Sequence, residues 1–152
     1  MGELTHIDER GQARMVGVGH KPAVVRRAVA RSRVRVAPET AAAITEGRVP
    51  KGDVGAVARL AGIAAAKRTP ELVFLCHPLP IDGASVEVDI SPEGVVTVTA
   101  TVETTARTGV EMEALTAAAV AALNVYDLVK GIDPDPLIER VELVSKEKAA
   151  PG

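Results

Sequence analysis

The stretch that decides the fold is Thr108–Lys130, Thr-Gly-Val-Glu-Met-Glu-Ala-Leu-Thr-Ala-Ala-Ala-Val-Ala-Ala-Leu-Asn-Val-Tyr-Asp-Leu-Val-Lys. Its middle consists almost entirely of alanine, leucine and valine, and its ionisable residues lie near the two ends. This composition predicts one long helix that is mostly buried, because a helix that is apolar for most of its length has to pack against other elements. Thr108 and Glu111 match a capping box, which predicts the start of the helix, and Gly131 predicts its end.

The two ends of this helix are too far apart to serve one small-molecule pocket in a single subunit. Glu111 and Asp127 are sixteen residues apart, and at ~1.5 Å of rise per residue they lie roughly 24 Å from each other. Two copies of the helix that run antiparallel across a subunit boundary would bring opposite ends together. A site that uses both ends therefore favours an oligomer.

The composition is that of a soluble globular protein with few aromatic residues. With 152 residues, of which 47% are hydrophobic and 25% charged, the chain is expected to form a single domain over 1–152, with 1–14 and 145–152 flexible. Phe74 and Tyr126 are the only aromatic residues, so the core has to be built from alanine, valine, leucine and isoleucine. The net charge of −2 and the lack of stacking aromatics argue against a nucleic-acid partner.

Cysteine content and hydropathy narrow the cellular setting. Cys76 is the only cysteine, which excludes an intrachain disulfide and a multi-cysteine zinc site. The N-terminal region has no apolar run of signal-peptide length, and no stretch reaches ~20 apolar residues without a charge. The sequence therefore predicts a cytoplasmic protein that does not enter a membrane, and no cluster with the spacing of a metal site occurs in it.

The remaining elements follow from hydrophobic periodicity. Apolar residues at every second position predict strands, and capping residues, glycines and prolines mark the helices between them. The expected elements are a strand at Val24–Val36, a short helix at Pro38–Gly47, a helix from Asp53 to Lys67, strands at Ser85–Ile90 and Val95–Thr105, the long helix and a strand at Leu137–Val144. Met15–Gly19 is either a further strand or the lip of a site. Together these elements predict an α+β, ferredoxin-like two-layer sandwich (β-α-β-β-α-β) with an additional N-terminal strand and a short helix.

The helix from Asp53 to Lys67 carries an apolar stripe and clear boundary signals. Asp53 is suited to cap its N-terminus, and the Thr69-Pro70 pair is expected to stop it. The stripe consists of Val57, Leu60, Ala61 and Ala64.

The first candidate for chemistry is the Cys76-His77 pair, which ends an apolar run and precedes Pro-Leu-Pro. The prolines could hold His77 in a fixed direction toward a ligand, although an exposed loop histidine is the commoner case. Nucleophilic catalysis by the pair is less attractive, because neighbours in an extended segment point to opposite faces.

Charged residues at the helix ends allow both a structural and a functional interpretation. Glu111 and Glu113 could simply complement the helix dipole, and Asp127 and Lys130 could form a surface ion pair. Because Asp127 follows an apolar run, it could instead be partly desolvated with a shifted pKa. Lys51 precedes a helix N-terminus, where a phosphate could bind, but the P-loop pattern is absent.

Further positive charge comes from Lys67, Arg68, Arg107 and the arginines of the first strand, Arg26, Arg27, Arg31, Arg33 and Arg35. Such residues are usually a solvated face. They could also form a phosphate funnel or, as a weaker alternative, an edge that contacts RNA.

Several blocks of the sequence resemble the cyclic pyranopterin monophosphate synthases, the C proteins of molybdenum cofactor biosynthesis. The resemblance extends from about Leu4 to Val144, and the blocks that carry it are Lys51–Val54, Ala58–Ile63, Ala65–Thr69, Leu75–Leu79, Thr108–Thr116 and Tyr126–Lys130. It implies a lyase that rearranges 3′,8-cyclo-7,8-dihydroguanosine triphosphate to cyclic pyranopterin monophosphate and releases pyrophosphate. It also implies a ferredoxin-like homohexamer, a trimer of dimers, with active sites between subunits.

The resemblance assigns roles to individual residues. The residues that match its catalytic positions are Asp127, Lys130 and Lys51. Those expected to bind the substrate are Leu75, Cys76, His77, Met112, Glu113 and Lys67. We expect no cofactor or metal, although a divalent cation could accompany the triphosphate.

The sequence departs from this family in two places. Gly17 stands where the family usually has aspartate, in Met15-Val-Gly-Val-Gly19, and the chain ends in Ser145-Lys-Glu-Lys-Ala-Ala-Pro-Gly152 in place of a basic glycine-rich tail. Lys146 and Lys148 could replace some of that charge. These departures leave a non-catalytic homologue that binds a purine triphosphate as the alternative function.

Overall fold

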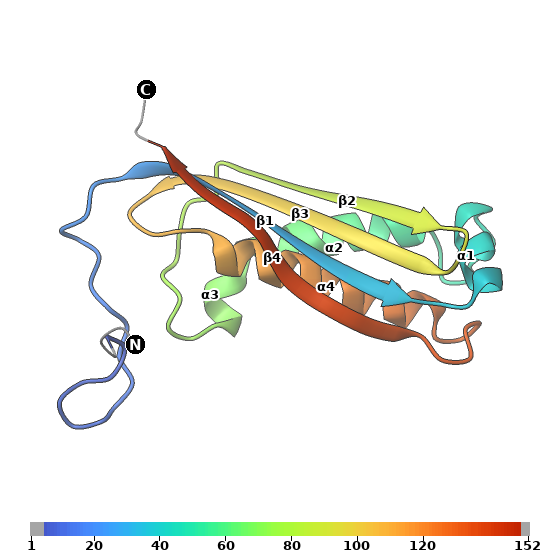
Figure 1. The fold of residues 1–152 in the computed structure, drawn as a ribbon, viewed down its shortest axis with the longest axis horizontal. Helices are drawn as coiled ribbons and strands as arrows, with labels where there is room; N and C mark the ends of the chain where they lie inside the picture. Colours follow the sequence, from blue (N-terminus) through green and yellow to red (C-terminus); the bar gives the residue numbers. More distant parts are fainter. Residues whose placement is uncertain (1–4, 150–152) are drawn as a thin grey trace.

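The computed structural model describes residues 5–149 and contains one sheet with helices on one of its faces (Figure 1). Three of the strands and the two long helices lie where the sequence predicts them, within a few residues. The elements in chain order are β1 (Val24–Arg35), α1 (Pro38–Thr45), α2 (Val54–Lys67), α3 (Thr69–Leu72), β2 (Gly83–Ser91), β3 (Val95–Ala106), α4 (Glu111–Val129) and β4 (Leu137–Ala149).

The strands are all antiparallel and lie in the order β2-β3-β1-β4. With α2 and α4 packed side by side on the same face, this is the order of a ferredoxin-like sandwich, so the predicted fold class is confirmed (Figure 1). The pairing of β1 with β3 sets Ala30 opposite Ala100 and Val34 opposite Val96. These small residues are fully buried and form part of the sheet surface against which α4 packs.

The core is built from small side chains, which lets the two long helices approach each other closely. A Cβ atom on Gly62 would lie 2.9 Å from Val86 Cγ2 and 3.1 Å from the Ala117 carbonyl oxygen. The absence of a side chain at Gly62 therefore sets the distance between α2 and α4. The Ser32 hydroxyl, buried under α4, donates to the Ala118 carbonyl oxygen at 2.8 Å, so this polar group is satisfied in the core.

The face that α2 buries is not the apolar stripe that the sequence suggests. Its buried residues are Val54, Ala58, Gly62, Ala65 and Ala66. Val57 and Leu60 of the stripe remain 37% and 69% exposed. Small residues occupy the buried face of α2 because they allow the close approach to α4, and the larger apolar residues point outward.

One of the two predicted N-terminal caps is present. Asp53 accepts a hydrogen bond from the Ala56 amide at 2.9 Å, which confirms it as the cap of α2. The capping box predicted for the long helix is wrong, because α4 begins at Glu111, its cap residue is Val110, and no side chain caps it. Thr69-Pro70 does follow the end of α2, but it begins the short helix α3, with proline in the first turn.

The structure assigns secondary structure to part of each chain end. β4 extends to Ala149 because β1 begins at Val24 and offers pairing partners, among them Ala28 for Lys146 and Arg26 for Lys148. Residues 145–149 of the predicted flexible tail thus belong to a paired strand, and 150–152 lie outside the described residues. In the predicted leader, Ile7 and Ala13 form an isolated bridge, and residues 1–4 lie outside the description. The additional N-terminal strand is also wrong, since 15–19 is not a strand.

By length and composition α4 could span a membrane. It lies against the sheet with half of its apolar window buried, and its buried side includes Ala114, Ala118, Ala121 and Val125. These contacts are those of the core helix of a folded domain.

Candidate active site at the two ends of helix α4

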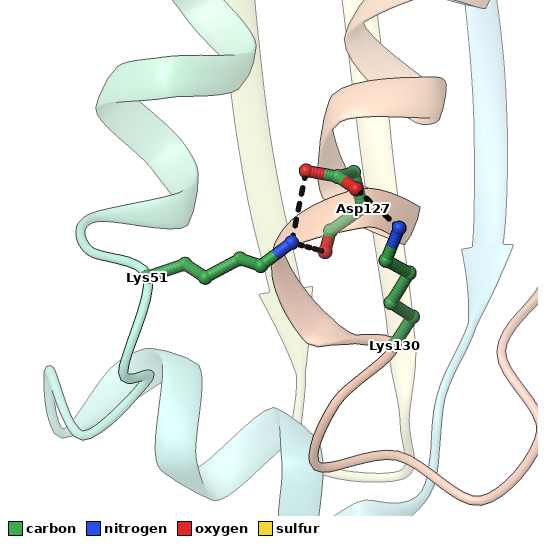
Figure 2. Close-up of polar contacts among 3 residues, drawn as sticks. All are labelled: Lys51, Asp127 and Lys130. Atoms are coloured by element: carbon green, nitrogen blue, oxygen red, sulfur yellow. Dashed lines mark hydrogen bonds and ion pairs between the residues drawn. The ribbon is translucent and has the colours of Figure 1, made fainter.

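Asp127 lies in the last turn of α4 between two lysine side chains (Figure 2). Lys130 Nζ is 2.7 Å from Asp127 Oδ1, and Lys51 Nζ is 3.2 Å from Oδ2. Lys51 also donates to the Asp127 backbone carbonyl oxygen at 3.0 Å. The structure therefore brings together the three residues that the resemblance marks as catalytic, although Lys51 is 76 residues away in the chain.

The two lysines keep the Asp127 carboxylate charged. Hydrogen bonds from Lys130 and Lys51, together with their positive charges, lower the pKa of Asp127, and the hydrogen bond to Asp127 raises the pKa of Lys130. The side chain of Asp127 is 55% exposed in the isolated chain, so the predicted desolvation of Asp127 is wrong. The cluster joins one carboxylate to two lysine side chains, which suits the binding of an anion next to a proton-transfer group.

A buried aspartate that the sequence analysis missed supports this cluster. Asp133 is 6% exposed, and its carboxylate accepts hydrogen bonds from the Ala37 amide at 2.7 Å and the Asp135 amide at 2.9 Å. It thereby joins the segment after α4 to the start of α1, the helix that leads to Lys51. The Asp-Pro-Asp-Pro turn at 133–136 is a local signal for such a bond, but its long-range partner cannot be read from it.

A cavity of about 460 Å³ lies at the opposite, N-terminal end of α4. Leu75, Cys76, His77 and Met112, all predicted to bind the substrate, line it together with Glu111. Val16 and Val18 also line this cavity. Of the two interpretations of Met15–Gly19, the structure therefore supports the lip of a site.

Glu113 does not line this cavity in the isolated chain, and its role in substrate binding stays a prediction from the resemblance. Its side chain is 2% exposed, and its Oε1 atom accepts a hydrogen bond from Cys76 Sγ at 3.6 Å. Burial raises the pKa of Glu113, and burial together with the charge and hydrogen bond of Glu113 raises the pKa of the Cys76 thiol to about 11. A thiol in this state is protonated at neutral pH, which argues against a nucleophilic cysteine.

Lys67 is exposed in the last turn of α2 and lines none of the cavities described here. Its role in substrate binding stays a prediction from the resemblance. The helix dipole alone explains a lysine in the last turn of a helix.

A second, basic cavity of about 250 Å³ adjoins Glu111. Arg26, Arg27, Lys146 and Lys148 line it, and Lys146 Nζ lies 3.8 Å from Glu111 Oε1. The two lysines reach this position because β4 continues past Val144, which the sequence analysis did not predict.

The arginines of β1 are largely balanced by acidic neighbours. Arg27 pairs with Glu103 at 3.3 Å, and Arg33 and Arg35 both pair with Glu139, at 3.7 and 3.2 Å. This arrangement supports the interpretation of a solvated face over that of an RNA-binding edge, because neutralised arginines release few counterions on binding.

The fold and the two clusters define a class of protein: a ferredoxin-like α+β protein with an Asp-Lys-Lys cluster at one end of its core helix and a Cys-His cavity at the other. The sequence comparisons then identify the family. The MoaC family matches residues 15–149, and the chain belongs to it. The resemblance stated from the sequence blocks is thereby confirmed.

Relatives of known name cover essentially the whole chain. A protein of Thermomicrobium roseum is 56% identical over 153 residues, which is 100% of this chain and 92% of the relative. A protein of Pelotomaculum thermopropionicum is 55% identical over 100% of this chain and 90% of the relative. One of Cereibacter sphaeroides is 53% identical, with 100% and 96% covered. All three are named cyclic pyranopterin monophosphate synthase.

Proposed function

We propose that this chain is a cyclic pyranopterin monophosphate synthase, a lyase of molybdenum cofactor biosynthesis. It converts 3′,8-cyclo-7,8-dihydroguanosine triphosphate to cyclic pyranopterin monophosphate and pyrophosphate. The names of relatives that are 53–56% identical over the whole chain support this activity. The structural observation that carries it is the position of Asp127 between Lys51 and Lys130.

In this proposal the Asp-Lys-Lys cluster moves protons while the ring of the purine opens and the new ring closes. The two lysines favour the ionised form of Asp127, and Lys130 holds a proton that it can donate and recover. Lys51 fixes both the side chain and the backbone carbonyl of Asp127, so the carboxylate keeps one direction during the reaction.

The triphosphate requires a separate group of cations. Arg26, Lys146 and Lys148 surround the basic cavity beside Glu111, close to the Cys-His cavity that also includes Glu111. Cations at this position would hold the phosphates and stabilise the charge that develops as pyrophosphate leaves. His77 and Met112 would then contact the purine-derived ring system.

The two halves of the site lie at opposite ends of α4, so one subunit does not supply both to one substrate. We propose that the protein is a homohexamer, a trimer of dimers, in which the Asp-Lys-Lys cluster of one subunit completes the Cys-His cavity of another. The exposed apolar residues on α2 and α4 support such contacts, with Leu60 69%, Leu123 57% and Tyr126 38% exposed.

The proposed reaction uses side chains of the protein and the substrate alone, without a resident cofactor or a nucleic-acid or membrane partner, in the cytoplasm. A divalent cation that arrives with the triphosphate is compatible with this scheme. Turnover after dialysis against EDTA measures that contribution: full loss with recovery on adding Mg²⁺ would show that the reaction requires the ion.

The direct test is incubation of the purified protein with the cyclised dihydroguanosine triphosphate, with the cyclic monophosphate and pyrophosphate measured separately. Asp127→Ala and Lys51→Ala should each abolish turnover and leave the oligomer assembled. Arg48→Ala is the matched control, because Arg48 is an exposed cation in the same loop whose recorded partner is Glu46. An intact wild-type oligomer without turnover would disprove the proposed activity.

The second candidate is a homologue that binds a purine triphosphate without converting it, favoured by Gly17. A Cβ atom at Gly17 would have no atom within 4 Å, so the aspartate that is usual in the family can be restored without steric conflict. Binding of the substrate without product, by both the wild type and Gly17→Asp, would support this alternative. Product from Gly17→Asp alone would show that the loss of this one residue inactivates the chain.

A further inference from the structure

Asp133 connects the two parts of the chain that supply the lysines of the Asp-Lys-Lys cluster. Lys130 lies three residues before Asp133, at the point where the chain leaves α4. Lys51 lies in the loop after α1, and Asp133 binds the opposite, N-terminal end of that helix. A contact between these two segments can therefore decide how both lysines meet Asp127.

The carboxylate of Asp133 takes the place of a capping side chain at the start of α1. The N-cap residue of this helix is Ala37, and no local side chain caps it. Asp133 Oδ2 instead accepts a hydrogen bond from the Ala37 amide at 2.7 Å, and the carboxylate also accepts one from the buried Thr40 hydroxyl. Because a negative charge at a helix N-terminus is favourable, Asp133 holds α1 although it lies 96 residues from Ala37 in the chain.

Asp133 also fixes the turn that follows α4. Its Oδ1 atom accepts a hydrogen bond from the Asp135 amide at 2.9 Å. The amides of Ile132 and Asp133 both donate to the Val129 carbonyl oxygen, at 2.9 and 2.8 Å. Lys130 lies within this bonded turn, so the position of its backbone is tied to that of Asp133.

Short-range bonds carry the position of α1 to Lys51. The Arg48 amide donates to the Ala43 carbonyl oxygen of α1 at 2.8 Å, and the Gly52 amide donates to the Val49 carbonyl oxygen at 3.1 Å. Val49 is 6% exposed, which anchors the loop in the core. Lys51 extends from this anchored loop toward the last turn of α4 (Figure 2).

We propose that Asp133 is a positioning residue of the Asp-Lys-Lys cluster. It clamps the start of α1 to the turn after α4 and thereby fixes Lys51 and Lys130 relative to Asp127. Its carboxylate is buried and its hydrogen-bond partners lie outside the cluster, so it acts through the backbone and does not touch the substrate. The effect on turnover rests on the proposed function, whereas the effect on the contact between Lys51 and Asp127 does not.

The contact test measures how fast acetic anhydride acylates Lys51 relative to Lys67, with both sites read from peptide mass spectra. Lys51 Nζ donates to the carboxylate and the backbone carbonyl of Asp127, which protects it, whereas Lys67 is an exposed reference in the same molecule. Asp133→Ala should raise the ratio of Lys51 to Lys67 labelling about threefold, because the bonds to Asp127 loosen. Asp133→Asn removes the same charge but keeps an acceptor oxygen, and it should raise the ratio by no more than about half as much.

An unchanged labelling ratio in folded Asp133→Ala would overturn the proposal, and circular dichroism establishes that each variant is folded. If Asp133→Ala does not fold, Ala37→Pro decides. This variant removes the amide that donates to Asp133, and the φ angle of −66° at Ala37 already suits proline. It should raise the labelling ratio as Asp133→Ala does, and an unchanged ratio would again contradict the clamp.

The turnover test separates kcat from KM. Asp133→Ala should lower kcat by about tenfold and leave KM within about twofold, because the proton-transfer groups shift while the cavities at the other end of α4 stay intact. Ala37→Pro should act in the same direction, and the double variant should lose little more than either single variant. Losses that multiply would show that the two residues act independently and would overturn the proposal.

Ser32→Ala is the control for stability alone. It removes a buried hydrogen bond between β1 and the middle of α4, and it should change kcat by less than about twofold. An equal fall of kcat in Ser32→Ala and Asp133→Ala would reduce the effect to general destabilisation and refute the positioning role. A wild-type protein without turnover would remove the proposed function but leave the labelling ratio to decide the role of Asp133.

Discussion

Asp133→Ala is the substitution whose effect on stability can be worked out most directly from the structure. The Asp133 carboxylate is buried and accepts hydrogen bonds from the Ala37 and Asp135 amides. Truncation to alanine leaves both amides without this partner. It also removes a side chain that joins the segment after α4 to the start of α1.

The expected loss follows from these bonds. A hydrogen bond to a charged group contributes about 1.5–3 kcal/mol, and a buried donor left unpaired costs about 1–3 kcal/mol. Because water can reach part of this turn, we expect Asp133→Ala to lower the free energy of unfolding by about 3 kcal/mol in total. Asp133→Asn keeps one acceptor oxygen and should lose about half as much.

The assay is urea unfolding followed by far-ultraviolet circular dichroism, at fixed protein concentration because association adds to apparent stability. Asp135→Ala is the matched control, since Asp135 is exposed in the same turn, and it should stay within about 0.5 kcal/mol of the wild type. A loss below about 1 kcal/mol for Asp133→Ala would refute the reasoning, because it would mean that water replaces both bonds at little cost.

The pH dependence provides a second check on the same residue. Burial by itself would raise the pKa of Asp133, but hydrogen bonds from Thr40, Ala37 and Asp135 outweigh it and lower the pKa below its ordinary value of 3.8. A carboxyl whose pKa is lower in the folded state stabilises the fold above its unfolded pKa and loses this effect as the pH falls through the folded value. The stability difference between wild type and Asp133→Asn should therefore persist at neutral pH and shrink only below pH 3.8.

Three further substitutions test the core, a helix cap and the catalytic cluster. Gly62→Ala should lower the free energy of unfolding by about 1–2 kcal/mol in urea, because overpacking against Val86 outweighs the gain in helix propensity. A stabilised variant would contradict the close approach of α2 and α4. Asp53→Ala should lose about 1 kcal/mol in the same assay through the missing cap, and no loss would mean that water caps α2 equally well. Asp127→Asn should lower kcat by about 10²–10⁴ without dissociating the oligomer, and an unchanged kcat would remove Asp127 from the mechanism. Because the pKa of Asp127 lies below 3.8, titration of Asp127 should cause no change in the kcat of the wild type above pH 3.8.

The strands that bury one face could be predicted from the sequence because their pattern is local. β3 alternates more buried and more open positions along its whole length, and β2 does so from Ser85 to Ile90, so period two identifies both without knowledge of their partners. The last five residues of β4, 145–149, carry no such pattern, since they are mostly polar and exposed. Their pairing depends on β1, more than a hundred residues earlier, and only the folded chain supplies it.

The inner face of α2 shows a second limit of pattern reading. A stripe of larger apolar residues normally marks the buried face of a helix, and here it marks the exposed one. The sheet and α4 accept only small residues opposite Gly62, so packing distance decides which face is buried. Val57 and Leu60 are then available for contacts with another subunit.

The residues of the candidate site could be named from the sequence, but their partners could not. Lys51 reaches Asp127 because the loop after α1 and the last turn of α4 meet at one end of the sheet, which no local spacing indicates. For Glu113 the resemblance indicates substrate binding, and the contact of its carboxylate with the Cys76 thiol could not be read from the sequence. Resemblance identifies which residues are important, and the direction of a side chain has to come from packing.

The two ends of α4 hold carboxyl groups in opposite protonation environments, and this difference follows from their positions. At the C-terminus the helix dipole disfavours a carboxylate, so Asp127 depends on Lys51 and Lys130, which together lower its pKa. At the N-terminus the dipole favours a carboxylate, but burial of Glu113 outweighs it and raises the pKa. Groups whose environments move their pKa values apart can divide acid and base roles between them. If subunits bring opposite ends of α4 together, the completed site places an ionised carboxylate and its lysines near a second carboxyl group whose burial favours the protonated form.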